Sequence, residues 1–187
     1  RRPLEIGDVE LLEGKTVNLK VVEKGDLPLL LGWRDDWGLE SEDRYNPVAT
    51  QQSLTEFEKE YEKLGPNEKW FFIEEKDGTK IGYIGTHLYN SLEIGYSLIP
   101  SKRGKGHCTE AVQIMVGYLF LSKDLVRIQA ATHLENRASQ RVLEKAGFQK
   151  EGVARNGMFV RGNWTDVSFY SILREEWKEP KILTKTA

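Results

Sequence analysis

The first part of the chain changes from the period of a strand to that of a helix. Residues Thr16 to Val22 alternate apolar and polar side chains, a pattern that predicts a strand. Asp26 is typical of a helix N-cap and Pro28 of a first helical turn, so we expect a helix that reaches about Trp33. The stretch from Asp35 to Thr50 is polar and poorly periodic, which predicts a loop.

The middle of the chain has the pattern of one helix followed by a meander of strands. Ser53, with Glu56 three residues later, forms a capping box for a helix of about Leu54 to Leu64. Two strand-like segments flank Asp77 and Gly78, which is typical of a hairpin. The strands expected are Trp70 to Glu75, Lys80 to Tyr89 and, continuing the antiparallel meander, Leu92 to Ile99.

The last part predicts two helices and three strands. A helix of about Cys108 to Leu121 carries an apolar stripe, made of Ala111, Ile114, Met115 and Tyr118. The strand Arg127 to Thr132 follows a helical crossover, so it should lie parallel to the strand before it. A helix at Arg137 to Lys145 should end at Gly147, with Phe148 folding back on it. The last strand pair expected is Gly152 to Arg161 and Trp164 to Leu173.

Length and composition indicate one globular domain. The chain has 187 residues, of which 39% are apolar and 30% charged, as in soluble globular proteins. Its strands and helices alternate without a repeat or a linker. We therefore expect a single domain over residues 1–187 with an α/β (α+β) fold built on a mixed sheet.

Charge and cysteine content exclude several classes of protein. A net charge of −2 argues against a protein that coats nucleic acid, and no apolar run approaches the ~18 residues of a membrane span. Cys108 is the only cysteine, so no disulfide framework is possible and a cytoplasmic location is expected. The three histidines, His87, His107 and His133, have no metal-ligand spacing, so no metal is expected.

One segment joins two glycines to basic and hydroxyl side chains, between the strand that ends at Ile99 and the next helix. It consists of Arg103, Gly104, Lys105, Gly106, His107, Cys108 and Thr109. Glycines let the backbone approach a ligand, and the start of a helix offers unpaired N–H groups, so the segment is suited to a phosphate or pyrophosphate. A plain strand-to-helix connection would need the same glycines, but the basic and hydroxyl residues favour an anionic ligand.

Two better-known phosphate motifs do not fit this chain. A dinucleotide fingerprint needs a third glycine where Thr109 stands. A P-loop ending in Gly14-Lys15-Thr16 would need a glycine where Val9 stands. The sequence therefore predicts neither nucleotide site.

A second polar pair lies where the parallel strand ends. Asn136 and Ser139 follow the strand that ends at Thr132, and the loops after Ile99 and Thr132 should open at the same edge of the sheet. Open α/β sheets bind ligands at such an edge. A plain helix start, with Asn136 as N-cap and Ser139 in the first turn, explains the same residues without a ligand.

The chain resembles the GNAT acyl-CoA N-acetyltransferases, and most nearly their branch of Rim-type ribosomal-protein N-terminal acetyltransferases. The resemblance spans about residues 15–178, the expected core of the domain, and rests on ordered blocks. These blocks are 26–34, Glu93-Ile-Gly-Tyr96, Arg103-Gly-Lys-Gly106, Asn136-Arg-Ala-Ser139, Val142 to Phe148, Glu151-Gly-Val153, Trp164 to Val167 and Arg174 to Trp177. It implies a mostly antiparallel sheet with one splayed parallel pair at the acyl-CoA site and helices on both faces.

The resemblance also implies roles for the residues singled out above. The segment Arg103 to Cys108 would cradle the pyrophosphate of acetyl-CoA, and Leu98 and Ile99 would bond its pantetheine arm through their main chain. A backbone N–H near Leu98 would stabilise the oxyanion. Asn136 would contact the same arm, and Ser139 would act as acid for the departing thiolate.

A general base is expected at Glu93 on the central strand, acting through water, although a solvated strand residue would look the same.

Three positions depart from the family pattern. Cys108 replaces the usual Gly or Ala and puts a thiol beside the cofactor. Leu143 replaces a tyrosine that serves as acid in many relatives. The stretch Asn156 to Met158 lacks a carboxylate that Rim-type relatives often have.

These departures leave the acceptor amine open. The expected reaction is direct acetyl transfer in a ternary complex to a protein or peptide N-terminus, by a monomer or homodimer. A small amine such as an amino acid, polyamine or antibiotic is the first alternative, and an acyl-CoA sensor without catalysis is the second. The acidic stretch Asp35 to Asp43 would attract a cationic acceptor or be a solvated loop, while Trp33, Trp37 and Tyr45 would line the acceptor pocket or cap the core.

Overall fold

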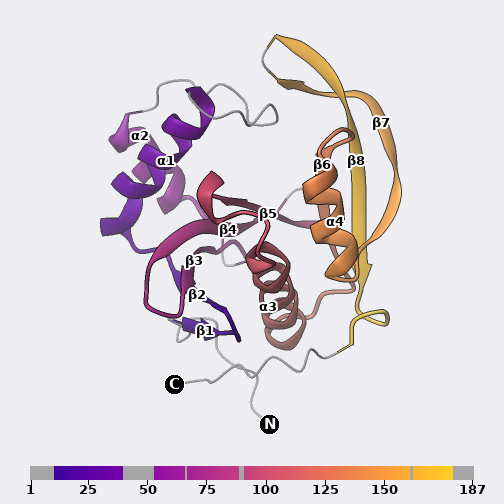
Figure 1. Ribbon diagram of the computed structural model, residues 1–187, viewed down its shortest axis with the longest axis horizontal. Coiled ribbons are helices and arrows are strands. Elements are labelled where there is room, and N and C mark those ends of the chain that lie inside the picture. Colours follow the sequence, from indigo (N-terminus) through magenta and orange to yellow (C-terminus); the bar gives the residue numbers. More distant parts are fainter. Residues whose placement is uncertain (1–10, 40–52, 66, 89–90, 161, 179–187) are drawn as a thin grey trace.

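The fold is one eight-stranded mixed sheet, seen in a computed structural model that describes residues 11–39, 53–65, 67–88, 91–160 and 162–178 (Figure 1). The strands are β1 Leu11–Glu13, β2 Val17–Val21, β3 Trp70–Glu75, β4 Lys80–Leu88, β5 Leu92–Leu98, β6 Arg127–His133, β7 Gln149–Val160 and β8 Asn163–Leu173. The helices are α1 Leu27–Leu39, α2 Leu54–Glu62, α3 His107–Ser122 and α4 Arg137–Lys145.

The order across the sheet is β1-β2-β3-β4-β5-β6-β8-β7. Neighbouring strands are antiparallel except β5 and β6, which are parallel because α3 carries the chain back between them. The predicted mixed α/β fold, its antiparallel meander and its one parallel pair are confirmed.

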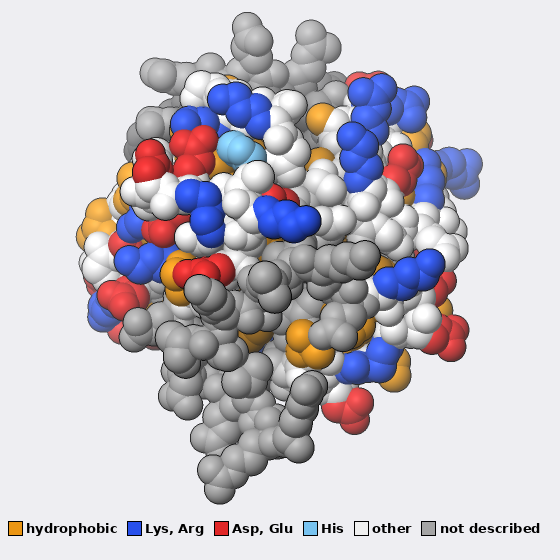
Figure 2. All heavy atoms as spheres, turned by 60° about the horizontal axis from the view of Figure 1, so that its bottom comes forward, with side chains coloured by type: hydrophobic (Ala, Val, Ile, Leu, Met, Phe, Trp, Pro, Cys, Tyr) orange, Lys and Arg blue, Asp and Glu red, His pale blue; other side chains and the backbone are white. Residues whose placement is uncertain are grey.

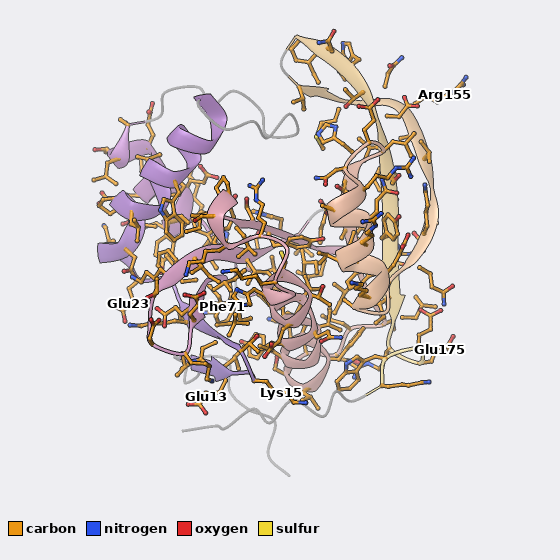
Figure 3. The ribbon with its side chains drawn as sticks, in the orientation of Figure 1. Glu13, Lys15, Glu23, Phe71, Arg155 and Glu175 are labelled. Atoms are coloured by element: carbon orange, nitrogen blue, oxygen red, sulfur yellow. The ribbon has the colours of Figure 1, made fainter. Side chains whose placement is uncertain are left out.

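The two faces of the sheet bury two hydrophobic clusters. Phe71 and Phe72 are neighbours on β3 and point to opposite faces, as successive strand residues must. Phe71 packs with α3, and Figure 3 labels it in the interior of the molecule. Phe72 packs with Leu27 and Leu30 of α1 and with Trp70. Figure 1 shows α1 and α2 together on one side, while α3 and α4 cover the other cluster.

Both ends of α3 are tied to the rest of the fold by charged side chains. Near its start, the Glu110 carboxylate accepts hydrogen bonds from the main chain of Lys15 and Thr16 and from the Thr16 hydroxyl. At its end, the Arg174 guanidinium donates to three carbonyl groups, those of Phe120, Lys123 and Leu125, at 2.6–2.8 Å. Carbonyl groups at the end of a helix lack partners within the helix, so Arg174 stabilises the segment where α3 ends.

Most local predictions from turn chemistry are confirmed. Ser53 and Glu56 form the predicted capping box of α2. The predicted bounds of α4 are those observed, and the N–H of Phe148 returns to the carbonyl of Leu143 at 3.0 Å, next to Gly147 at φ 97°. These elements depend on a few adjacent residues, so local reasoning was sufficient for them.

The prediction for α1 was right about its start at Leu27, with Pro28 in the first turn, but wrong about its end and its N-cap. The helix continues to Leu39 instead of stopping near Trp33, so the first residues of the expected loop are helical. Burial of Leu27 and Leu30 stabilises its first turns, and extending a helix that has already formed is inexpensive. Asp26 does not act as the expected N-cap of this helix, because its carboxylate accepts from the Glu23 N–H at 3.0 Å and pairs with Lys80 at 2.7 Å.

Two strand predictions also need correction. The three-residue strand β1 was not predicted, because its register is set by pairing with β2 rather than by its own pattern. Strand β7 begins at Gln149 rather than Gly152 and contains two register shifts, one of them at Ala154–Met158, where Asn156 has φ 48°. Figure 3 labels Arg155 of this irregular part near the bend of the β7–β8 hairpin.

The described surface mixes charges of both signs. Figure 2 shows Lys and Arg side chains interspersed with Asp and Glu side chains on the face turned to the viewer, with no broad region of one sign. In the described part of the chain, no helix is long and apolar enough to cross a membrane.

Candidate active site

The site is built on the divergence of β5 from β6. The two strands share one ladder position, Glu93 opposite Gln129, although β5 continues to Leu98 and β6 to His133. Beyond this position the main chain on that edge of β5 has no strand partner among the described residues. The edge is therefore available to a ligand that hydrogen-bonds as a strand would.

Alternate residues of β5 direct their main-chain N–H and C=O groups to opposite edges of the strand. The Ile99 N–H donates to the carbonyl of Ile81 in β4 at 2.9 Å, and the Ile99 carbonyl accepts from the Lys102 N–H at 3.0 Å. Since alternate residues of an antiparallel strand face opposite neighbours, the main-chain groups of Leu98 face the gap toward β6. The Leu98 N–H therefore has the orientation expected of a pantetheine contact, whereas the Leu98 carbonyl accepts from Nε of Arg103 and both main-chain groups of Ile99 have partners.

The predicted glycine turn lies directly after β5. Gly104 and Gly106 have φ values of 77° and 84°, which few residues other than glycine adopt. Gly106 is the N-cap residue of α3, and no side chain caps this helix. The first N–H groups of α3 thus have no acceptor within the helix, and a Cβ added at either glycine would meet no atom within 4 Å.

The other residues of the turn differ in how they are placed. Arg103 donates from Nε to the carbonyl of Leu98 at 3.0 Å, so it ties the turn to the end of β5. Lys105 is exposed, and Thr109 is partly exposed in the first turn of α3. The Nδ1 atom of His107 is buried and has no hydrogen-bond partner in the described part of the chain. The uncapped helix start, rather than this buried nitrogen, fits the anionic group of an acyl-CoA.

Asn136 and Ser139 meet at the start of α4, as predicted. The Asn136 side-chain oxygen accepts from the Ser139 N–H at 3.1 Å, so Asn136 is the N-cap of α4. This accounts for its presence without a ligand. Its side-chain NH₂ group and the Ser139 hydroxyl remain the polar groups that this turn can offer to a substrate.

Tyr96 was not among the predicted site residues. Its hydroxyl oxygen lies 3.0 Å from Oγ of Ser139 and 3.3 Å from the Ser139 carbonyl oxygen. The contact bridges the two diverging arms of the site, from β5 to α4. Nothing in the local pattern around Tyr96 signals it, because the two residues are 43 positions apart in the chain.

Glu93 lies at the point where the strands separate. The Gln129 side-chain amide donates to its carboxylate at 3.2 Å, and His87 is directly opposite on β4. Burial raises the pKa of Glu93, while the Gln129 hydrogen bond and the charge of His87 oppose this shift. Its side chain is on the other face of the sheet from Tyr96, because odd and even residues of β5 alternate.

Cys108 is in the first turn of α3. Burial raises the pKa of its thiol to about 12, and the nearby charge of Arg103 only partly offsets this. A thiol is reactive mainly as its thiolate, so we expect Cys108 to react slowly although it is next to the glycine turn.

The acceptor side is described only in part. Leu143 is fully buried against the core, so no side chain from this position of α4 reaches the site. The ring of Trp33 packs edge to face on that of Phe72, with 5.8 Å between the ring centroids. Trp33 thus covers the hydrophobic cluster that contains Phe72. Trp37 and Tyr45, and with them the predicted role of the acidic stretch Asp35–Asp43, lie outside the described side chains.

Comparison with known proteins gives the family. The sequence model of the acetyltransferase (GNAT) domain matches residues 17–149. The chain is 32% identical to the probable N-acetyltransferase YjcK of Bacillus subtilis (strain 168), over 89% of this chain and 98% of that protein. The chain therefore belongs to the GNAT acetyltransferase family. It is an acetyl-CoA-dependent N-acetyltransferase, and acetyl-CoA is its cosubstrate.

Two further relatives differ in what they acetylate. The [ribosomal protein uS5]-alanine N-acetyltransferase of Escherichia coli (strain K12) is 28% identical over 48% of this chain and 46% of that protein. The structure of spermidine N-acetyltransferase from Vibrio cholerae, solved with CoA and spermine, has a TM-score of 0.75. It is 23% identical and covers 86% of this chain and 97% of that one, so it supports the fold.

The burial of Cys108 predicts its reactivity. In the native protein at pH 8, a disulfide reagent such as DTNB should modify less than about a tenth of Cys108 in the time that free cysteine reacts fully, because thiolate is scarce far below the pKa. The same protein in denaturant is the control and should release one equivalent of thiol product. Rapid modification of the native protein would contradict the buried thiol.

Proposed function

We propose that the chain acetylates the α-amine of a polypeptide N-terminus, with acetyl-CoA bound between β5 and β6 and its pyrophosphate on the glycine turn. The observation that carries the donor assignment is the uncapped start of α3. Two glycines with positive φ precede it, and it directly follows the unpartnered edge of β5. Backbone N–H groups at a helix start are suited to a pyrophosphate and leave side chains free for other work.

The rest of the donor would follow the edge of β5. Its pantetheine arm would hydrogen-bond the main chain of Leu98, in the place that a longer β6 would take in a regular sheet. A second β5 N–H that faces the gap, near Leu98, would stabilise the oxyanion that forms when the thioester carbonyl is attacked. Ile99 has no comparable part, since both of its main-chain groups have partners.

The chemistry needs one proton acceptor and one donor. The amine nitrogen forms a bond to the acetyl carbon, the C–S bond breaks, and the nitrogen loses a proton. Glu93 would take this proton through water, helped by its position where the strands separate. Ser139, at the start of α4, would donate a hydrogen bond to the departing sulfur.

An α-amine suits this machinery better than a lysine side chain. Its reference pKa is about 8, against about 10.4 for lysine, so a larger fraction is neutral and nucleophilic near pH 7. A relative that acetylates the alanine of ribosomal protein uS5 supports a protein N-terminus. The similarity in fold to a spermidine acetyltransferase favours a small polyamine as the second candidate.

The role of Glu93 predicts a pH dependence. A general base must be deprotonated, so turnover should rise with pH through the pKa of Glu93, which burial places above that of an exposed glutamate. Glu93→Gln should lower kcat about a hundredfold and leave only the acidic limb set by the acceptor amine, which must also be neutral to attack. Glu175→Gln, at an exposed residue far from β5, is the matched control and should leave kcat and the profile unchanged (Figure 3). An unchanged kcat in Glu93→Gln would exclude Glu93 as the base.

The acceptor is tested with a matched set of amines. Thiol release from acetyl-CoA should be fastest with a peptide that begins with a free alanine. The same peptide with a blocked N-terminus and an internal lysine is the control, and it should be at least about tenfold slower. Turnover of spermidine without turnover of the peptide would replace the proposed acceptor by a polyamine. Thiol release with neither, despite binding of acetyl-CoA, would favour a sensor without catalysis.

A further inference from the structure

Tyr96 supplies a hydroxyl group at the start of α4 from an unexpected direction. Its ring packs against the core cluster from β5, and its oxygen lies 3.0 Å from the hydroxyl and 3.3 Å from the carbonyl oxygen of Ser139. Helix α4 itself contains no tyrosine, and its Leu143 is fully buried. A phenol is therefore present beside Ser139, but it comes from the opposite arm of the site.

The hydrogen-bond inventory of the two residues limits what each can do. Ser139 and Tyr96 have one hydroxyl proton apiece, and both oxygens can also accept. If the Ser139 proton is directed at a departing sulfur, its oxygen can still accept, and the Tyr96 hydroxyl is at the right distance to donate to it. Burial raises the pKa of Tyr96, so the phenol keeps its proton and remains a donor.

We propose that Tyr96 is a positioning residue of acetyl transfer: its hydroxyl donates to Ser139 and so orients the Ser139 O–H toward the sulfur of the departing CoA. The proposal rests on the function proposed above, in which Ser139 faces that sulfur. As the C–S bond breaks, its electron pair goes to sulfur, Ser139 donates a hydrogen bond to it, and the amine gives up one proton to Glu93 through water. Tyr96 keeps its proton throughout.

The alternative is that the Tyr96 hydroxyl only holds α4 against the sheet, and the chain contains a second tyrosine suited to a comparison. The Tyr170 hydroxyl of β8 also reaches α4, where it lies 3.3 Å from side-chain oxygens of Gln140 and Glu144. No hydrogen bond between Tyr170 and Ser139 is found in the described part of the chain. A tyrosine that only fixes α4 to the sheet should behave like Tyr170, whereas one that orients Ser139 should not.

The test compares Tyr96→Phe, Ser139→Ala, the double variant and Tyr170→Phe. Thiol release from acetyl-CoA is measured with an alanine-initiated peptide and, separately, with water as the only acceptor, and acetyl-CoA affinity is measured by calorimetry. Tyr96→Phe should lower kcat about tenfold with both acceptors and change the Kd for acetyl-CoA less than about twofold, as expected for the loss of one hydrogen bond. In the Ser139→Ala background it should have no further effect. Tyr170→Phe should stay within about twofold of the parent.

Each outcome decides a different point. Equal losses of kcat in Tyr96→Phe and Tyr170→Phe, or additive losses in the double variant, would overturn the positioning role and leave the proposed function intact. A Ser139→Ala variant with unchanged kcat would remove both Ser139 and Tyr96 from the mechanism while acetyl transfer stands. No thiol release by the parent protein with either acceptor would overturn the proposed function itself.

Discussion

The single hydrogen-bonded position between β5 and β6 is the constraint on which the site depends. From Glu93 and Gln129 onward the two parallel strands separate, so the sheet stops being continuous in its middle. A gap in a sheet leaves main-chain N–H and C=O groups without strand partners. A ligand that can hydrogen-bond like a strand can pair with them, and the pantetheine arm of an acyl-CoA has amides that are suited to this.

The elements around the gap fix its two arms separately. On one side, β5 is held by its antiparallel register with β4, and Arg103 bonds the end of β5 to the glycine turn. On the other side, β6 is held by β8, and α4 begins at the Asn136 cap. Helix α3 connects the arms and is anchored at both ends, by Glu110 and by Arg174. Among the described residues, the Tyr96–Ser139 contact joins the two arms directly beyond the last ladder position, which is why a change there should affect chemistry more than folding.

Local chemistry in the sequence predicted the conformation of the glycine turn and of its neighbouring elements well. The glycine turn, the strand before it and the Asn136 cap depend on a few neighbouring residues, and each has the conformation that its pattern predicts. The end of α1 was mispredicted because its packed first turns form the helix and extending a formed helix is inexpensive, so the weak periodicity after Trp33 did not stop it. The partners of Tyr96, Glu110 and Arg174 were not predictable, because each lies more than 40 positions away in the chain and leaves no periodic trace. The role of the stretch Asp35–Asp43 in acceptor choice stays a prediction, because the sequence gives the composition of this stretch but not its geometry.

The central claim is that the turn before α3 binds the pyrophosphate of acetyl-CoA, and charge at Gly106 tests it most directly. Asn and Asp both tolerate the positive φ of this position and have nearly the same shape, so Gly106→Asn and Gly106→Asp differ mainly in one negative charge. The dissociation constant for acetyl-CoA, measured by calorimetry on both variants, should be at least about tenfold higher for Gly106→Asp than for Gly106→Asn, because a carboxylate beside a pyrophosphate repels it. Equal dissociation constants for the two variants would contradict the account and place the pyrophosphate elsewhere.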